Sequence, residues 1–74
     1  MQTLRIRDEQ GRTSVVRMKQ VIMAIASYEE NLLGGSWTVI IWVDKGDGFR
    51  ETYDTEKEAL ARLDEIEQKL YEMK

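Results

Sequence analysis

Apolar and polar residues alternate near the start of the chain, over Thr3–Arg7 and again from Thr13. A period of two is typical of half-buried β-strands. The polar segment between these runs contains Gly11 and predicts a hairpin loop. The alternation assigns four side chains to the core, which are Leu4, Ile6, Val16 and Met18. The chain therefore is expected to begin with a β-hairpin.

The segment Trp37–Val43 is apolar on both faces of its predicted strand. One face carries Trp37, Val39, Ile41 and Val43, and the other carries Thr38, Ile40 and Trp42. Such a strand is normally central in a sheet and covered on both sides. The glycine-rich segment 44–48 predicts a turn, and Phe49–Asp54 a further strand in which Phe49 and Tyr53 share a face.

The segment Val21–Tyr28 is ambiguous. Its length and its valine and isoleucine residues favour a strand that pairs with Trp37–Val43. The alternative is a helix that ends at Gly34 and Gly35. If the segment is a strand, Glu29–Gly35 becomes a connecting loop in which the two glycines supply positive φ angles.

The segment Thr55–Met73 predicts an amphipathic helix. Thr55 and Glu58 have the spacing of a capping box at its start. A single apolar stripe runs along it through Ala59, Leu63, Ile66, Leu70 and Met73. On its flank, two pairs have the i,i+4 spacing of ion pairs: Glu58 with Arg62, and Glu65 with Lys69.

These elements predict an α+β fold, an antiparallel meander of four to five strands with one C-terminal helix packed on one face. Residues 1–74 form one domain, because the chain is too short for two. One helix covers only one face of the sheet. Apolar side chains then remain on the other face: Ile40, Trp42 and, if the ambiguous segment is a strand, Val21, Met23 and Ile25. Exposed patches of this kind usually mark an interface.

The amino-acid composition limits the classes of function that the chain can have. The chain has no Cys and no His, so it lacks a thiolate nucleophile, an imidazole base and the usual ligands of structural zinc. We therefore expect no enzyme, no cofactor and no metal site. The acidic pairs Glu56/Glu58 and Asp64/Glu65 are expected on a solvated helix face, and Asp44–Gly48 reads as a hairpin turn rather than a calcium loop. A domain this small that lacks disulfides is also expected to form a homo-oligomer.

The N-terminal sequence has no apolar segment typical of a signal peptide. The longest apolar run, Val21–Ala26, is far shorter than the ~20 residues that cross a membrane. These features predict a cytoplasmic protein without a membrane partner. The net charge of −3 also disfavours binding to duplex nucleic acid. Residues 1–20 nevertheless carry five basic side chains against two acidic ones, so the charge does not exclude a small anionic ligand.

One set of predicted surface residues has the chemistry of a binding site. On the sheet face away from the helix, the alternation gathers Arg5, Arg7, Arg17, Lys19, Trp42, Arg50 and Thr52. Cations beside an indole bind phosphate while a base stacks on the ring. The ordinary alternative is that the charges simply face solvent and that Trp42 fills a dimer interface. A protein partner would instead be held by Ile40 and Trp42 together with the acidic helix face.

The string Phe49–Leu60, followed by Leu63–Ile66, resembles the C-terminal end of small uncharacterised proteins of Gram-positive bacteria and their phages. Leu4–Arg7 resembles the Arg-Ile-Arg-like strand with which those proteins begin. The resemblance implies a compact β-sheet-plus-helix fold, and it carries no activity and no site residues. Small phage proteins of this size often act by binding, including as inhibitors of host defence.

Together, the composition and the resemblance predict a non-enzymatic binding protein of phage origin in the host cytoplasm. Its predicted role is to inhibit a host defence component by binding a host protein. Two alternatives remain open: a sponge that sequesters a nucleotide immune signal through the basic and aromatic sheet face, and a structural phage component.

Overall fold

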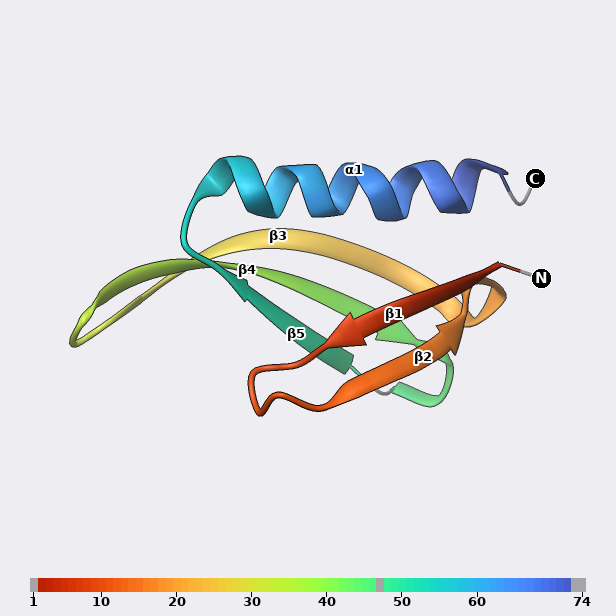
Figure 1. Cartoon of the computed structure of the whole chain (residues 1–74), viewed down its shortest axis with the longest axis horizontal. Coiled ribbons are helices and arrows are strands. Elements are labelled where there is room, and N and C mark those ends of the chain that lie inside the picture. Colours follow the sequence, from red (N-terminus) through yellow and green to blue (C-terminus); the bar gives the residue numbers. More distant parts are fainter. Residues whose placement is uncertain (1, 47, 73–74) are drawn as a thin grey trace.

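The computed structural model describes residues 2–46 and 48–72 and shows five strands and one helix (Figure 1). The elements in chain order are β1 (Thr3–Arg7), β2 (Thr13–Arg17), the 3₁₀ turn η1 (Met18–Gln20), β3 (Val21–Asn31), β4 (Gly34–Val43), the 3₁₀ turn η2 (Asp44–Gly46), β5 (Gly48–Tyr53) and α1 (Glu56–Glu72). The predicted α+β fold with one C-terminal helix is confirmed. Two predicted positions, Asp47 in the turn and Met73 in the helical stripe, lie outside the described residues.

The strands form two antiparallel sheets rather than one. The small sheet contains β1 and β2, and the large sheet has the order β3-β4-β5. The predicted central position of Trp37–Val43 and its pairing with Val21–Tyr28 are both confirmed, with Ala24 opposite Ile41 and Ala26 opposite Val39. Each ladder joins strands that follow one another in the sequence, so each sheet is a meander.

One core lies between the two sheets and α1. Its buried residues are Leu4, Ile6, Met18, Val21, Val39, Ile41, Val43, Ala59 and Ile66. Three of the four inward positions predicted for the first hairpin are fully buried, and Val16 packs against them. We call the side of the large sheet that points into this core the core face, and the other side the outer face.

Strand β3 contains an irregularity that hydrophobic alternation did not predict. The register shifts between Val21 and Met23, so Ile22 is an extra residue on the strand. Val21 is therefore buried in the core, while Met23 and Ile25 lie on the outer face. The expectation that all three share the outer face is wrong, because a bulge reverses the alternation that follows it.

The predicted loop Glu29–Gly35 is also wrong. The strands continue to Asn31 and resume at Gly34, which leaves residues 32–33 as the turn. The resulting β3–β4 arm projects beyond the start of α1 (Figure 1). Gly34 has the expected positive φ of 124°. Gly35 has a different role, since a Cβ there would lie only 1.8 Å from the Tyr28 hydroxyl oxygen. The Tyr28 ring thus lies directly over the Gly35 backbone.

Aromatic packing supports the β3–β4 arm, and a capping interaction supports the first turn of α1. The rings of Tyr28 and Trp37 pack with centroids 5.6 Å apart. At the start of α1, the Glu58 amide donates to the Thr55 hydroxyl oxygen at 3.2 Å, and that hydroxyl donates to the Glu58 carboxylate at 3.1 Å. The predicted cap is thereby confirmed.

Candidate protein-binding surface and the charged seam

The outer face of the large sheet carries a contiguous group of apolar side chains. Strand pairing aligns them in two neighbouring rows, with Met23 beside Trp42 and Ile25 beside Ile40. We call these residues the outer patch: Met23, Ile25, Ile40 and Trp42. Met23 and Ile25 are 49% and 38% exposed, and Ile40 and Trp42 are half-buried. Among residues 2–46 and 48–72, the helix and the small sheet pack against the opposite, core face.

Trp42 is held in place at one end of the outer patch. It pairs with Gly48 across the β4–β5 ladder. A Cβ at Gly48 would contact the indole Cδ1 and Nε1 atoms at 3.6 Å, so the ring lies alongside that residue. Because glycine has no side chain, it leaves room for the indole beside the strand. A half-buried tryptophan in such a setting presents area with little conformational entropy to lose on binding.

Arg50 lies at the rim of the outer patch and is already paired. It forms ion pairs with Glu29 of β3 and, at 3.4 Å, with Glu9 of the first hairpin loop. All three side chains are about half exposed, between 41% and 52%. Its single positive charge therefore faces two carboxylates, and the three side chains together carry one net negative charge. The predicted use of Arg50 as a phosphate ligand would require these pairs to open.

The remaining predicted cations lie elsewhere. Arg5, Arg7 and Arg17 are exposed on the outer side of the small sheet, where Arg5 stands opposite Val15. Lys19 is exposed in η1. In the described part of the chain, none of these four side chains forms an ion pair. The predicted single face is thus divided, with its cations on the small sheet and in η1, and Ile40, Trp42 and Arg50 on the large sheet.

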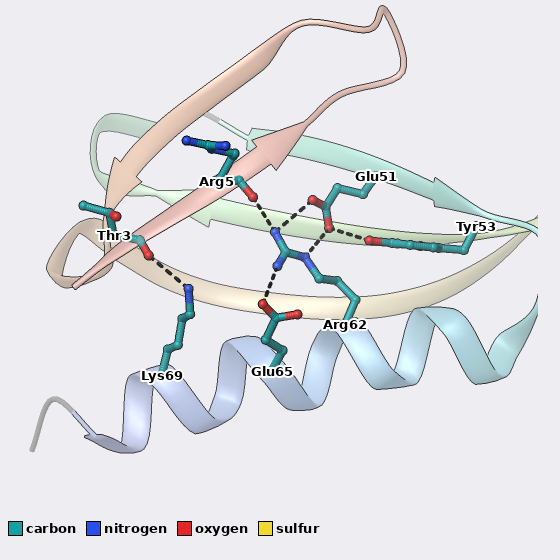
Figure 2. A network of polar contacts seen from close by, with 7 residues as sticks. All are labelled: Thr3, Arg5, Glu51, Tyr53, Arg62, Glu65 and Lys69. Carbon is teal, nitrogen blue, oxygen red and sulfur yellow. Dashed lines mark hydrogen bonds and ion pairs between the residues drawn. The ribbon is translucent and has the colours of Figure 1, made fainter.

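A buried ion pair joins α1 to β5 (Figure 2). The Arg62 Nε donates to Oε1 of Glu51 at 2.8 Å, and its Nη2 donates to Oε2 at 3.0 Å. The two side chains are only 13% and 7% exposed. The Tyr53 hydroxyl donates to the same carboxylate at 3.1 Å, and Glu65 lies 3.3 Å from Arg62 Nη1. This bidentate geometry is the strongest arrangement that an arginine and a carboxylate adopt.

The same arginine also reaches the small sheet. Gln2 O accepts from the Met18 amide, and the alternation of an antiparallel pair then turns the carbonyls of Thr3 and Arg5 away from β2. Arg62 Nη2 donates to Arg5 O at 2.6 Å, and Lys69 Nζ donates to Thr3 O at 3.2 Å (Figure 2). We call this contact between β1, β5 and α1 the seam.

The seam corrects two predictions about the helix. Arg62 pairs with Glu51 and Glu65 instead of Glu58, and Lys69 bonds to a β1 carbonyl instead of Glu65. Sequence analysis also missed Glu51 entirely. The available signal was its position: Glu51 lies between Phe49 and Tyr53, the two residues predicted to share a face. A carboxylate at an inward strand position indicates a buried partner.

The electrostatics of the seam favour a structural role. Burial, then the charge of Glu51 and the hydrogen bond to it, raise the pKa of Tyr53 to about 12. Burial alone would lower the pKa of Arg62, but the hydrogen bond and charge of Glu51 outweigh it and raise that pKa. In the described residues, no buried side-chain nitrogen or oxygen lacks a hydrogen-bond partner. Each polar group of the seam is therefore already engaged.

Open space lies beside the seam. A hollow of about 490 Å³ is lined by Arg5, Arg7, Thr13, Glu51, Tyr53, Arg62 and Glu65. Its lining combines two unpaired guanidinium groups with an aromatic ring. In the part of the chain described by the structure, no group of three or more acidic side chains is placed to hold a metal ion.

The acidic surface of α1 is separate from the outer patch. The helix packs on the core face, where Ala59 and Ile66 meet Val39 and Ile41. Ile40 and Trp42 point to the opposite side of the same strand. The predicted use of these two residues together with the acidic helix face would therefore require a partner that contacts two separate surfaces.

The function of the outer patch is inferred from its residues alone, because the comparisons with known proteins identify no relative. No family model, no curated protein and no solved structure matches this chain. Across the described residues, no helix has the length and apolar character needed to cross a membrane.

Proposed function

We propose that the protein is a non-enzymatic binding domain whose outer patch contacts a partner protein. The observation that carries the proposal is the alignment of four apolar side chains in adjacent rows on a sheet face that no described helix or strand covers. Trp42 and Ile40 lie on β4, the central strand of the large sheet, and supply one of the two rows of this surface. Buried aromatic anchors surrounded by weaker contacts are typical of protein interfaces.

The rim of the outer patch supports a protein partner over a charged ligand. Arg50 is paired with both Glu29 and Glu9, so it presents no free positive charge to an anionic ligand. Farther along the sheet, Ser27, Thr38 and Thr52 form a polar row that ends the apolar area, in which Thr38 is itself buried. An apolar area with a polar rim matches the surface of a folded protein or of an amphipathic segment.

We further propose that binding inhibits a host component, as an anti-defence protein of phage origin would. Support for this part comes from the resemblance of Phe49–Leu60 to small phage proteins and from the composition without His or Cys. The size of the chain also suits a protein that acts by masking a surface.

The proposal is tested by affinity purification from a bacterial lysate with three matched baits: the native chain, Trp42→Glu and Val15→Glu. Val15 is 58% exposed on the small sheet and controls for the added charge. We expect a protein that the native and Val15→Glu baits retain and the Trp42→Glu bait loses. Circular dichroism of each bait checks that it is folded. Retention by all three baits, or by none, contradicts the outer patch as the binding surface.

Once the partner is purified, calorimetry sharpens the test. Trp42→Ala should weaken binding by at least ~2 kcal/mol, or about 30-fold, as expected for a large aromatic anchor. Changes at the rim, such as Thr52→Ala, should have a much smaller effect. Equal effects at Trp42 and at the rim would place the anchor elsewhere.

A second candidate function rests on the unpaired cations. Arg5 and Arg7 line the hollow beside the seam together with Tyr53. A nucleotide signal would place phosphate against these guanidinium groups and a base against the ring. Titration with cyclic and linear oligonucleotides would then raise the melting temperature, and Arg5→Glu or Arg7→Glu would abolish the rise. Affinity should also fall as salt increases. No shift with any nucleotide eliminates this candidate.

A further inference from the structure

Strand β3 is an open edge of the large sheet. The sheet order is β3-β4-β5, so the side of β3 away from β4 has no strand partner among the described residues. Monomeric proteins protect such edges by making them short, by placing Pro or charged residues, especially Lys, on them, or by bulges that twist them away. β3 is 11 residues long and contains no Pro or Lys, and its two charged residues, Glu29 and Glu30, lie near its end. Its bulge at Ile22 lies near its start, and the pairing from Met23 to Asn31 is regular.

Apolar side chains flank this edge on both faces. Met23 and Ile25 of the outer patch lie on the outer face, and Ile22 in the bulge is 63% exposed. On the core face, a hollow of about 170 Å³ separates β3 from α1 and is lined by Ala24, Leu63, Ile66, Glu67 and Leu70. An added strand would therefore bury apolar surface on both sides while it satisfies the free backbone groups of β3.

The charges at the two ends of this edge are self-complementary. Glu30 lies at the end of β3 in the arm, whereas Lys19 lies just before its start. In an antiparallel pair of identical strands, the acidic end of each copy meets the basic end of the other. With the two-fold axis near Ile25, Glu30 stands opposite Gln20 of the second copy, next to Lys19.

We propose that two copies of this chain associate through their β3 strands in a symmetric antiparallel dimer. The pairing joins two sheets of three strands into one continuous sheet. The interface is isologous, so each favourable contact occurs twice. The arm, with Leu32 fully exposed at its tip, then extends along the second copy toward η1 and the end of α1. This inference does not depend on the proposed partner protein.

The dimer also changes the outer patch. Because β3 carries Met23 and Ile25, the patches of the two copies adjoin across the new strand pair. A partner protein would meet a surface of twice the area. The self-association of the purified chain is nevertheless measured without any partner, so a failure of the dimer leaves the proposed function untouched, and the reverse also holds.

The charge pattern gives a sharp test with two single variants, Glu30→Lys and Lys19→Glu. Each variant alone places like charges together at both symmetric contacts. Mixed one to one, they restore two opposite-charge contacts in a heterodimer. We expect the native chain to be dimeric by light scattering and each variant to dissociate about tenfold more readily. The mixture should recover the dimer, and native mass spectrometry should show the heterodimer in excess over both homodimers.

Controls separate this pairing from general charge effects. Asp64→Lys makes the same change of charge as Glu30→Lys, at an exposed position of α1 that is far from β3 in the sequence. It should leave the dimer unchanged. Hydrogen exchange gives a second readout, since alternate amides of β3 should become protected as concentration rises. A native chain that is monomeric at high micromolar concentration overturns the proposal. So does a dimer that both charge variants leave intact.

Discussion

The two faces of the large sheet carry similar side chains in different surroundings. Along β4, Val39 and Ile41 of the core face are fully buried, while their neighbours Ile40 and Trp42 of the outer face are half-buried. Each face also has a β5 residue in an arginine–glutamate contact: Glu51 of the core face pairs with Arg62, and Arg50 of the outer face pairs with Glu29 and Glu9. Apolar residues occupy both faces of β4, and the faces differ in that α1 and the small sheet cover only the core face.

The difference shows that burial, and not the type of contact, decides how much an ion pair contributes to the free energy of unfolding. The core pair has lost most of its water, so removing one partner leaves a charge without compensation. The outer pair remains solvated, and water replaces either partner at little cost. The same reasoning assigns the seam to stability and leaves the outer face available for recognition.

The largest expected effect is that of Arg62→Ala. The substitution leaves the Glu51 carboxylate, which is 7% exposed in the native chain, without its charged partner, and it also removes the donor to Arg5 O. We expect the free energy of unfolding to fall by ~3–5 kcal/mol, a large part of the ~4–11 kcal/mol expected for a domain of this size. Urea denaturation measures it. A Glu51→Gln/Arg62→Met double variant should recover part of the loss, and a loss below ~1 kcal/mol would contradict the buried seam.

The apolar side chains of β4 give the next comparison. Ile41→Ala removes a fully buried side chain and should cost ~2–5 kcal/mol. Ile40→Ala makes the same chemical change one residue earlier, on the half-buried outer face, and should cost clearly less. Thermal and urea denaturation of both variants measures the two losses of stability. Equal losses would mean that another layer covers the outer face in solution, and dilution would then reveal whether that layer is a second copy.

A smaller effect is expected at high pH from Tyr53. Its pKa is raised to about 12 in the folded state from 10.0, so folding favours the protonated hydroxyl. The contribution of this group is complete below pH 10 and is lost as pH rises from 10 toward 12. Urea denaturation over this range should show the native chain losing more stability than Tyr53→Phe. Parallel pH profiles would show that the hydroxyl is not coupled to Glu51.

The smallest effect should come from Arg50→Gln, the counterpart of the first prediction. Its side chain is 46% exposed, and we expect a loss of ~0–1 kcal/mol that shrinks further at high salt. The measurement is the same denaturation series at low and high ionic strength. A loss as large as that of Arg62→Ala would remove the contrast between the two faces.

Sequence reasoning succeeded where the structure follows local periods. The alternation in Trp37–Val43 and the spacing from Ala59 to Leu70 report directly which side of a strand or helix is buried. The capping pair Thr55 and Glu58 is likewise local. These elements were predictable because neighbours in the sequence determine them.

The failures involve information that no local period carries. A single extra residue at Ile22 reverses the faces of β3, and nothing in its hydropathy distinguishes it from its neighbours. The turn at residues 32–33 is Leu-Leu, without the Asn or Gly that usually indicates a tight hairpin. The partner of Arg62 lies 11 residues away on another element. The division of the candidate site over two sheets depends on which strands share hydrogen bonds, and alternation does not report that.

The order of the strands has a consequence for how the chain folds. Both sheets pair only consecutive strands, so their ladders form through short loops and at low entropic cost. The core face closes later, because Ala59 and Ile66 of α1 follow all five strands in the sequence. During synthesis, the part of the core face that α1 covers is therefore exposed on a formed or forming sheet until the helix has left the ribosome. We expect a nascent chain stalled before residue 56 to be a substrate for chaperones, and one released beyond residue 72 to escape them.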